Sequence, residues 1–161
     1  MAAADITERL ARYMVDARQR ALAPHVAREA RHRILDTLAA MVSGAHLKPG
    51  EMAIRYARAQ GGVEEASVLT TDIRTSAINA ALVNAMFGHA DETDDFHPAT
   101  KAHPGCAVVP AALAMAEREG RSGTELLRAV TLGYDLCCRF LSGCLRVVPG
   151  ARGRARCRAY R

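Results

Sequence analysis

The sequence is poor in aromatic residues: it has no tryptophan, and phenylalanine and tyrosine together make up 4% of the chain. It also lacks an uninterrupted apolar run of about 18 residues, the length that a membrane-spanning helix needs. Residues 1–5 (MAAAD) do not show the basic and then apolar order of a secretory signal. We therefore expect a cytoplasmic protein with no membrane partner.

Cysteine lacks an ordered pattern. There are five cysteines, an odd number, and their spacing matches no metal-ligand motif. Unpatterned thiols are typical of a reducing compartment rather than of a secreted disulfide framework. Cysteine usage therefore also favours the cytoplasm.

Positive charge is concentrated at one end of the sequence. The formal net charge is +5, from 22 Lys and Arg against 17 Asp and Glu. Five of the arginines lie in residues 152–161, which contain no acid, so the rest of the sequence holds 17 basic and 17 acidic residues. We interpret residues 146–161 as a disordered Arg-rich tail, a solvated end rather than a polyanion-binding arm. No nucleic-acid partner is expected.

Apolar residues recur at helical spacing through most of the remaining sequence. This spacing predicts six helices, which begin near Ile6, Pro24, Pro49, Ser76, Pro104 and Ser122. Residues 66–69 are at best a short extended segment. Half of the residues are hydrophobic and no strand alternation is found, so the predicted fold class is all-α, a helical bundle over residues 1–145.

Local signals predict where these helices end and which faces they bury. Gly44 is expected to end the second helix through left-handed geometry, and Gly61-Gly62 to end the third. Ser122 and Glu125 form a capping box for the last helix. The second helix is predicted to bury Val26, Ala30, Ile34, Leu35, Leu38 and Val42, and the last helix Leu126, Val130, Tyr134, Cys137 and Leu141. This last apolar face ends where the sequence loses its helical pattern, so it has no partner helix after it. We therefore interpret residues 1–145 as an incomplete domain. The tail is interpreted as the product of translation in the wrong frame.

Titratable residues gather in one stretch, GHADETDDFHPATKAHPG, residues 88–105. If the fourth helix continued to about residue 95, Asp91, Asp94 and Asp95 would share one face and repel one another. They would also oppose the dipole at the helix end. Either the chain leaves the helix early, or a cation, a basic side chain or proton sharing compensates. The adjoining histidines favour a functional role over a solvated acidic loop.

Two His-Pro steps predict where the next helix begins. His97 and His103 each precede a proline, and a residue before proline avoids helical geometry. Residues 97–103 are therefore a loop, with His103 at the N-cap of the helix that Pro104 opens. A helix N-terminus attracts anions and favours the neutral, proton-accepting imidazole. The pattern indicates a proton-abstraction site for a carboxylate ligand.

Other interpretations of this stretch are open. A divalent metal could be held by His89, Asp91, Asp94, His97 and His103, although their spacing matches no zinc or EF-hand signature. Cys106 lies in the first turn of the helix, where the dipole is expected to lower its pKa; it is either a nucleophile or a small packing residue. Lys101 is either solvated, or neutralises the acids and contacts an anionic substrate.

Residues 75–139 (TSAINAALVNAMFGHADETDDFHPATKAHPGCAVVPAALAMAEREGRSGTELLRAVTLGYDLCCR) resemble the N-terminal helical domain of the MmgE/PrpD family. The resemblance rests on the GHA helix end, the D-D segment, HPG, the VxPAxLAxAE pattern and the SGxELLxAxxxGY pattern. Earlier stretches, RILDTLAAMVSG and YARAQGG, also match, so the similarity covers about residues 5–145. The family includes 2-methylcitrate dehydratase, cis-aconitate decarboxylase and iminodisuccinate epimerase.

The resemblance implies a larger homodimeric enzyme without metal or organic cofactor, in which a helical domain pairs with an α/β lid. It implies chemistry at the carbon next to a carboxylate in a small polycarboxylate substrate. Carried onto this sequence, it matches His103 to the family's active-site histidine, and Asp94 and Asp95 to its paired acids. We therefore expect His103, Glu92 and Asp94 to be catalytic. The residues expected to bind substrate are Asp95, His97, Gly105, Lys101 and His89. Glu92 stands where many members carry aspartate, and Phe96 where many carry threonine or serine.

The resemblance also implies that further catalytic groups and the lid lie beyond residue 145 in family members. An elimination needs an aligned acid as well as a base. We therefore expect little or no turnover from this chain alone. The alternative is a standalone helical interaction module with the acidic loop as its partner surface.

Overall fold

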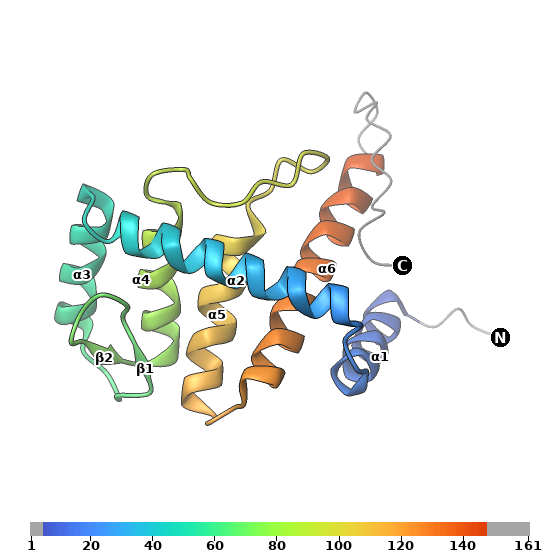
Figure 1. The fold of residues 1–161 in the computed structure, drawn as a ribbon, viewed down its shortest axis with the longest axis horizontal. Helices are drawn as coiled ribbons and strands as arrows, with labels where there is room; N and C mark the ends of the chain where they lie inside the picture. The colour runs from blue at the N-terminus through green and yellow to red at the C-terminus, as the bar shows by residue number, and fades with distance from the viewer. Residues whose placement is uncertain (1–4, 148–161) are drawn as a thin grey trace.

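The computed structural model describes residues 5–147, and side chains as far as residue 143. The described part contains six helices and two very short strands (Figure 1). The helices are α1 (Ile6–Gln19), α2 (Pro24–Gly44), α3 (Lys48–Gln60), α4 (Ala77–His89), α5 (Pro104–Arg118) and α6 (Gly123–Val147). Strands β1 (Ala66–Ser67) and β2 (Arg74–Thr75) pair antiparallel, with Ala66 opposite Thr75. The all-α prediction is confirmed.

The end of the chain is described only in part. Helix α6 continues to Val147, past the predicted domain boundary at residue 145. The rest of the predicted basic tail, residues 148–161, lies outside the described residues. None of the helices in the described part is both long and apolar enough to cross a lipid bilayer.

The helix starts follow the local sequence signals. Proline occupies the first turn of α2, α3 and α5, where its missing N–H costs no helical hydrogen bond. The predicted capping box opens α6: the Ser122 N–H donates to Glu125 Oε2 at 2.9 Å, and the Glu125 N–H donates to Ser122 Oγ at 3.3 Å. These starts confirm the predicted boundaries to within one or two residues.

The reason for Gly44 differs from the prediction. Helix α2 does end there, but Gly44 is not among the glycines with positive φ. A Cβ at this position would overlap the Phe87 carbonyl oxygen of α4 and would lie 2.9 Å from Ala90 Cβ. Glycine is therefore needed for the close crossing of α2 over α4, and the prediction of left-handed geometry is wrong. Helix α3 ends as predicted, with Gly61 as its C-cap at a positive φ of +56°.

Helix α2 organises the bundle. It crosses α4, α5 and α6, which lie beside one another, while α3 packs on α4 and α1 on α6 (Figure 1). The core lies beneath this crossing and contains Met41, Val83, Phe87, Val109 and Val130, each no more than 1% exposed.

The predicted buried faces are partly wrong. In α2, Leu35 is 67% and Val42 is 52% exposed, whereas Thr37, Ala40 and Met41 are buried. The buried face is thus shifted around the helix, because three helices on one side determine which residues are covered. In α6, Val130 and Tyr134 are buried as predicted, and Leu126, Cys137 and Leu141 are partly exposed.

Candidate active site

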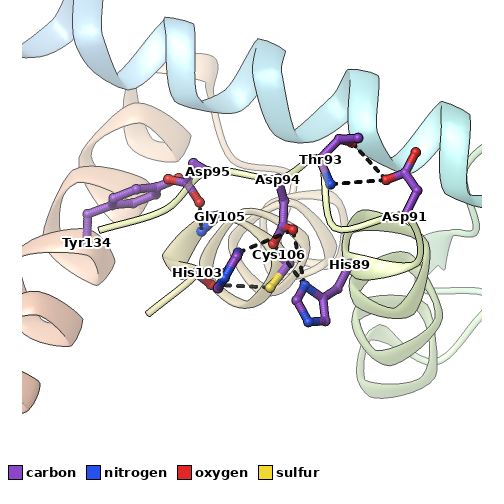
Figure 2. Close-up of polar contacts among 9 residues, drawn as sticks. All are labelled: His89, Asp91, Thr93, Asp94, Asp95, His103, Gly105, Cys106 and Tyr134. Atoms are coloured by element: carbon purple, nitrogen blue, oxygen red, sulfur yellow. Dashed lines mark hydrogen bonds and ion pairs between the residues drawn. The ribbon is translucent and has the colours of Figure 1, made fainter. Parts of the chain in front are cut away.

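The acidic loop, residues 90–96, does not continue helix α4. The helix ends at His89, so Asp91, Asp94 and Asp95 do not share a helical face. The chain turns at Glu92, whose φ of +55° lies in the left-handed region that non-glycine residues rarely adopt. The three aspartates consequently enter three different environments (Figure 2). Of the open alternatives, early departure from the helix is the one observed.

Asp91 anchors the start of this segment to α2. Its Oδ2 accepts a hydrogen bond from Ser43 Oγ at 2.6 Å, and its Oδ1 accepts one from Thr93 Oγ1 at 2.7 Å. These hydrogen bonds, that from Ser43 first, hold the pKa of Asp91 below its usual range. Asp91 therefore has a structural role, which is to hold the loop against α2.

Asp94 is a buried carboxylate between two imidazoles. Its side chain is fully buried, at 0% exposure. Its Oδ1 lies 3.1 Å from His89 Nδ1 and 3.4 Å from His103 Nδ1 (Figure 2). A proton carried by either imidazole would offset the charge that Asp94 brings into the interior. The structure therefore assembles two of the predicted histidines around one predicted acid.

His103 is the N-cap residue of α5, as predicted. Its side chain makes no capping hydrogen bond, and its Nδ1 is buried without a hydrogen-bond partner, just beyond bonding geometry from Asp94. The ring contacts two others, with its centroid 5.1 Å from that of His89 and 5.4 Å from that of Phe96. The imidazole is thus held by ring contacts and by the nearby carboxylate, and is not committed to capping the helix.

Asp95 caps α5 and ties it to α6. Its Oδ1 accepts the Gly105 N–H at 2.8 Å, and its Oδ2 accepts a hydrogen bond from Tyr134 Oη at 2.7 Å. Burial, together with this contact to Asp95, raises the pKa of Tyr134. A Cβ on Gly105 would lie 2.6 Å from Thr37 Oγ1 and 2.7 Å from Asp95 Oδ1, so glycine is required by space. Asp95 and Gly105 therefore have a structural role in addition to any contact with substrate.

Residues 97–102 form a small hairpin beside the site. The His97 N–H donates to the Ala102 carbonyl at 2.8 Å, and His97 Nδ1 lies 2.7 Å from Thr100 Oγ1. Lys101, at φ +61°, places its Nζ 5.2 Å from the centroid of the half-exposed Phe96 ring. Phe96 in turn contacts His103. Lys101 and His103 therefore both contact the Phe96 ring. His97 faces its own hairpin, and the exposed Glu92 stands at the turn before Asp94.

The expectation for Cys106 is wrong. Burial first, and then the neighbouring Asp94, raise the pKa of its thiol to about 12, against the expected lowering by the helix dipole. The Cys106 Sγ–H donates to the His103 carbonyl at 3.2 Å. A thiol with so high a pKa is not an activated nucleophile near neutral pH. Of the two predicted roles for Cys106, nucleophile or packing residue, the packing role fits better.

The structure gathers a different set of metal-binding groups from the one considered in the sequence. His89 Nδ1, an Asp94 oxygen and Cys106 Sγ all lie within 4.8 Å of one another. Asp91 and His97 take other partners, Ser43 and Thr100 respectively. The residues that could hold a cation therefore come from the end of α4, the acidic loop and the first turn of α5.

Three contributors to the site were missed from the sequence. Ser43, Thr37 and Tyr134 contact the acidic loop or Gly105 from α2 and α6. Helical spacing predicts burial of Tyr134, but 39 residues separate it from Asp95. No local spacing signals such a contact, because it depends on which helices pack together.

Comparison with known proteins agrees with this fold. Residues 8–145 match the MmgE/PrpD N-terminal domain. A curated relative, the cis-aconitate decarboxylase-like protein oryM of Aspergillus oryzae, is 26% identical over 138 residues. That alignment covers 81% of this chain and 29% of the relative, so the chain spans less than a third of the relative's length. The chain belongs to the MmgE/PrpD family, whose enzymes are dehydratases and decarboxylases acting on carboxylates, and it carries the N-terminal domain of that family.

Proposed function

We propose that this domain supplies the proton-accepting half of a MmgE/PrpD-type lyase or isomerase site for small polycarboxylates. His103 accepts the proton from the carbon next to a substrate carboxylate. The observation that carries the proposal is the His103 imidazole at the start of α5, with Nδ1 3.4 Å from the fully buried carboxylate of Asp94.

Asp94 acts through His103. When Nδ1–H points at Asp94 Oδ1, Nε2 carries the lone pair and can accept a proton from substrate. The imidazolium that results lies beside a buried negative charge, which stabilises it. The distance of 3.4 Å is longer than a hydrogen bond, and catalytic contacts of this kind commonly tighten when substrate binds.

The start of α5 offers less anion binding than a free helix end. Pro104 has no N–H, and the Gly105 N–H is used by Asp95. The dipole still favours a negative ligand there. Lys101 supplies a positive charge beside Phe96. We propose that Lys101, His97 and His89 contact substrate carboxylates, and that Asp95 and Gly105 act by shaping the helix start.

Glu92 is proposed as the second catalytic carboxyl group. It is exposed and sits in a strained left-handed conformation two residues before Asp94. Strain at such a position is maintained when the surrounding loop needs that geometry. The complete reaction, the homodimer, the cytoplasmic location and operation without a metal cofactor are part of the same proposal, and the remaining catalytic groups would come from sequence outside this domain.

Carboxylate binding to the 161-residue chain tests the proposal without requiring turnover. Citrate, titrated into the chain, is expected to shift the imidazole NMR signals of His103 and His89, with assignments from His103→Gln and His89→Gln. The signals of His25 and His32 on α2 serve as internal controls, and acetate as a monocarboxylate control. Shifts confined to the control histidines, or equal responses to acetate, would refute the proposed site.

A helical interaction module is the second candidate. Ile78 is 79%, Leu82 45% and Met86 38% exposed, and these residues lie at helical spacing on α4. Such an apolar stripe favours contact with another polypeptide. Sedimentation analysis separates the two: an independent module should be a stable monomer or a defined oligomer, whereas a piece of a larger enzyme should self-associate without a fixed size.

A further inference from the structure

We propose that His89, Asp94 and Cys106 form a binding site for a zinc-type divalent cation, and that the bound cation blocks the His103 site. Binding itself does not depend on the proposed function; the blocking effect rests on it. The three groups lie on separate segments, at the end of α4, in the acidic loop and in the first turn of α5 (Figure 2).

The geometry is close to that of a metal site. His89 Nδ1 lies 3.1 Å from Asp94 Oδ1 and 3.2 Å from Asp94 Oδ2, and all three donor atoms fall within 4.8 Å of one another. Ligands of a tetrahedral zinc are separated by about 3.3–3.8 Å, given metal–ligand distances of about 2.0–2.3 Å. A bound zinc ion would draw His89 Nδ1 and Cys106 Sγ closer together than they lie in this structure.

The donor set selects the kind of cation. One imidazole nitrogen, one carboxylate oxygen and one sulfur form a borderline-soft set that suits Zn²⁺ and Co²⁺. Ca²⁺ and Mg²⁺ prefer several oxygen ligands and are disfavoured here. Three protein ligands are one fewer than in a closed structural zinc site, so a water or a ligand carboxylate would complete the coordination.

The electrostatics of the cluster also fit a cation. The Asp94 side chain is 0% exposed, and the imidazoles of His89 and His103 are the groups that face its carboxylate. His103 Nδ1, directed at the same carboxylate, is buried without a hydrogen-bond partner. A dication would compensate the Asp94 carboxylate and the Cys106 thiolate, with the thiol proton released to solvent as the metal–sulfur bond forms. The His89 side chain is 49% exposed, which gives the cation a route in.

Occupancy would alter His103. The cation would withdraw Asp94 from its contact with the imidazole, so the carboxylate could no longer orient that ring or stabilise its protonated form. A zinc-type cation is therefore an inhibitor of this site and not its cofactor.

Cobalt titration followed by absorption tests the binding. A Cys144→Ser, Cys157→Ser form of the 161-residue chain, kept reduced, removes two other thiols. Co²⁺ is expected to produce a thiolate-to-cobalt charge-transfer band and tetrahedral d–d bands, which Zn²⁺ then abolishes. Cys106→Ser should remove the charge-transfer band, whereas Cys137→Ser, a partly buried cysteine on α6, should retain it. His89→Ala should weaken Co²⁺ binding by about tenfold or more.

Two outcomes would overturn the proposal. One is a cobalt spectrum unchanged by Cys106→Ser, and the other is an octahedral spectrum without a sulfur band. Because serine is close in size to cysteine, circular dichroism should show an intact fold, and Asp94→Asn offers a second variant with the same expected loss. The citrate titration contains no metal, so failure of metal binding and failure of the carboxylate site are seen separately.

Discussion

Tyr134 of α6 donates a hydrogen bond to Asp95 of the acidic loop at 2.7 Å, and Asp95 in turn accepts the N–H of Gly105 at the start of α5. This contact joins two parts of the chain that are 39 residues apart. It fixes the loop relative to the helix whose first residues border His103.

Replacement of Tyr134 by phenylalanine should leave the partly buried Asp95 Oδ2 without its donor. We expect the free energy of unfolding to fall by about 2 kcal/mol, the usual cost of an unpaired buried polar group. Urea unfolding measures the change. Tyr56→Phe on α3, where the ring is 40% exposed, is the matched control and should be nearly neutral. An equal loss in both variants would contradict the assigned role of Tyr134.

Gly105→Ala should destabilise the domain. The added Cβ would lie 2.6 Å from Thr37 Oγ1, 2.7 Å from Asp95 Oδ1 and 2.9 Å from Tyr134 Oη, so the cap must open or shift. A loss of about 1–3 kcal/mol is expected from such overpacking. Gly123→Ala in α6 meets no atom within 4 Å and should be neutral or stabilising by up to about 1 kcal/mol. Thermal or urea unfolding of the pair decides between strain and a general effect of alanine.

The capping box of α6 should make stability depend on pH. Hydrogen bonds from the Ser122 backbone and then its side chain hold the pKa of Glu125 below its usual range. A folded-state pKa below the unfolded value means that this contribution is present above the unfolded pKa. It is lost as the pH falls through the folded pKa. Urea midpoints on acidification should therefore fall less steeply in Glu125→Gln than in the parent chain, with Glu64→Gln, outside the helices, as control. Parallel curves for all three proteins would rule the effect out.

Helix α1 should loosen when Tyr13 is replaced. No residue of α1 is buried, and Tyr13 Oη donates to Asp135 of α6, which also accepts from Arg139 Nε at 2.7 Å. We expect Tyr13→Phe to cost about 1–2 kcal/mol. Hydrogen exchange should become faster in α1 while α4 keeps its protection. Faster exchange throughout the domain would show instead that α1 is integral to the core.

The hydrogen bond between Tyr13 and Asp135 should be lost at alkaline pH. The hydrogen bond to Asp135, followed by burial, raises the pKa of Tyr13. A raised folded-state pKa places the stabilising contribution below the unfolded tyrosine pKa, and the contribution disappears as the pH rises through the folded pKa. Alkaline solution should therefore release α1 in the parent chain, and Tyr13→Phe should show a smaller change in α1 exchange over the same range.

Local signals made much of the fold predictable. Pro24, Gly61 and Ser122 mark helix ends through their own backbone or side-chain chemistry, so the sequence alone places them. The position of His103 at a helix N-cap follows from the proline after it. Burial was harder to predict: Leu35 and Val42 fit a helical stripe but face solvent, because the neighbouring helices cover a different side of α2.

The location of the site could be predicted from the sequence, but the contacts among its residues could not. The acids and histidines lie in one stretch, which identified the region. The partners of Asp91, Asp95 and Gly105 are Ser43, Tyr134 and Thr37, which reach the stretch only through helix packing. The predicted lowering of the Cys106 pKa was also wrong, because burial and the approach of Asp94, which depend on tertiary packing, outweigh the helix dipole.

The anchoring of the acidic loop at both ends limits how the domain can admit a ligand. Ser43 holds Asp91 against one helix and Tyr134 holds Asp95 against another, so the loop between these residues is restrained at both ends. The hairpin of residues 97–102, which carries Lys101, lies beyond the second of these anchors. Ligand binding is therefore expected to displace the doubly anchored acidic loop less than the hairpin of residues 97–102.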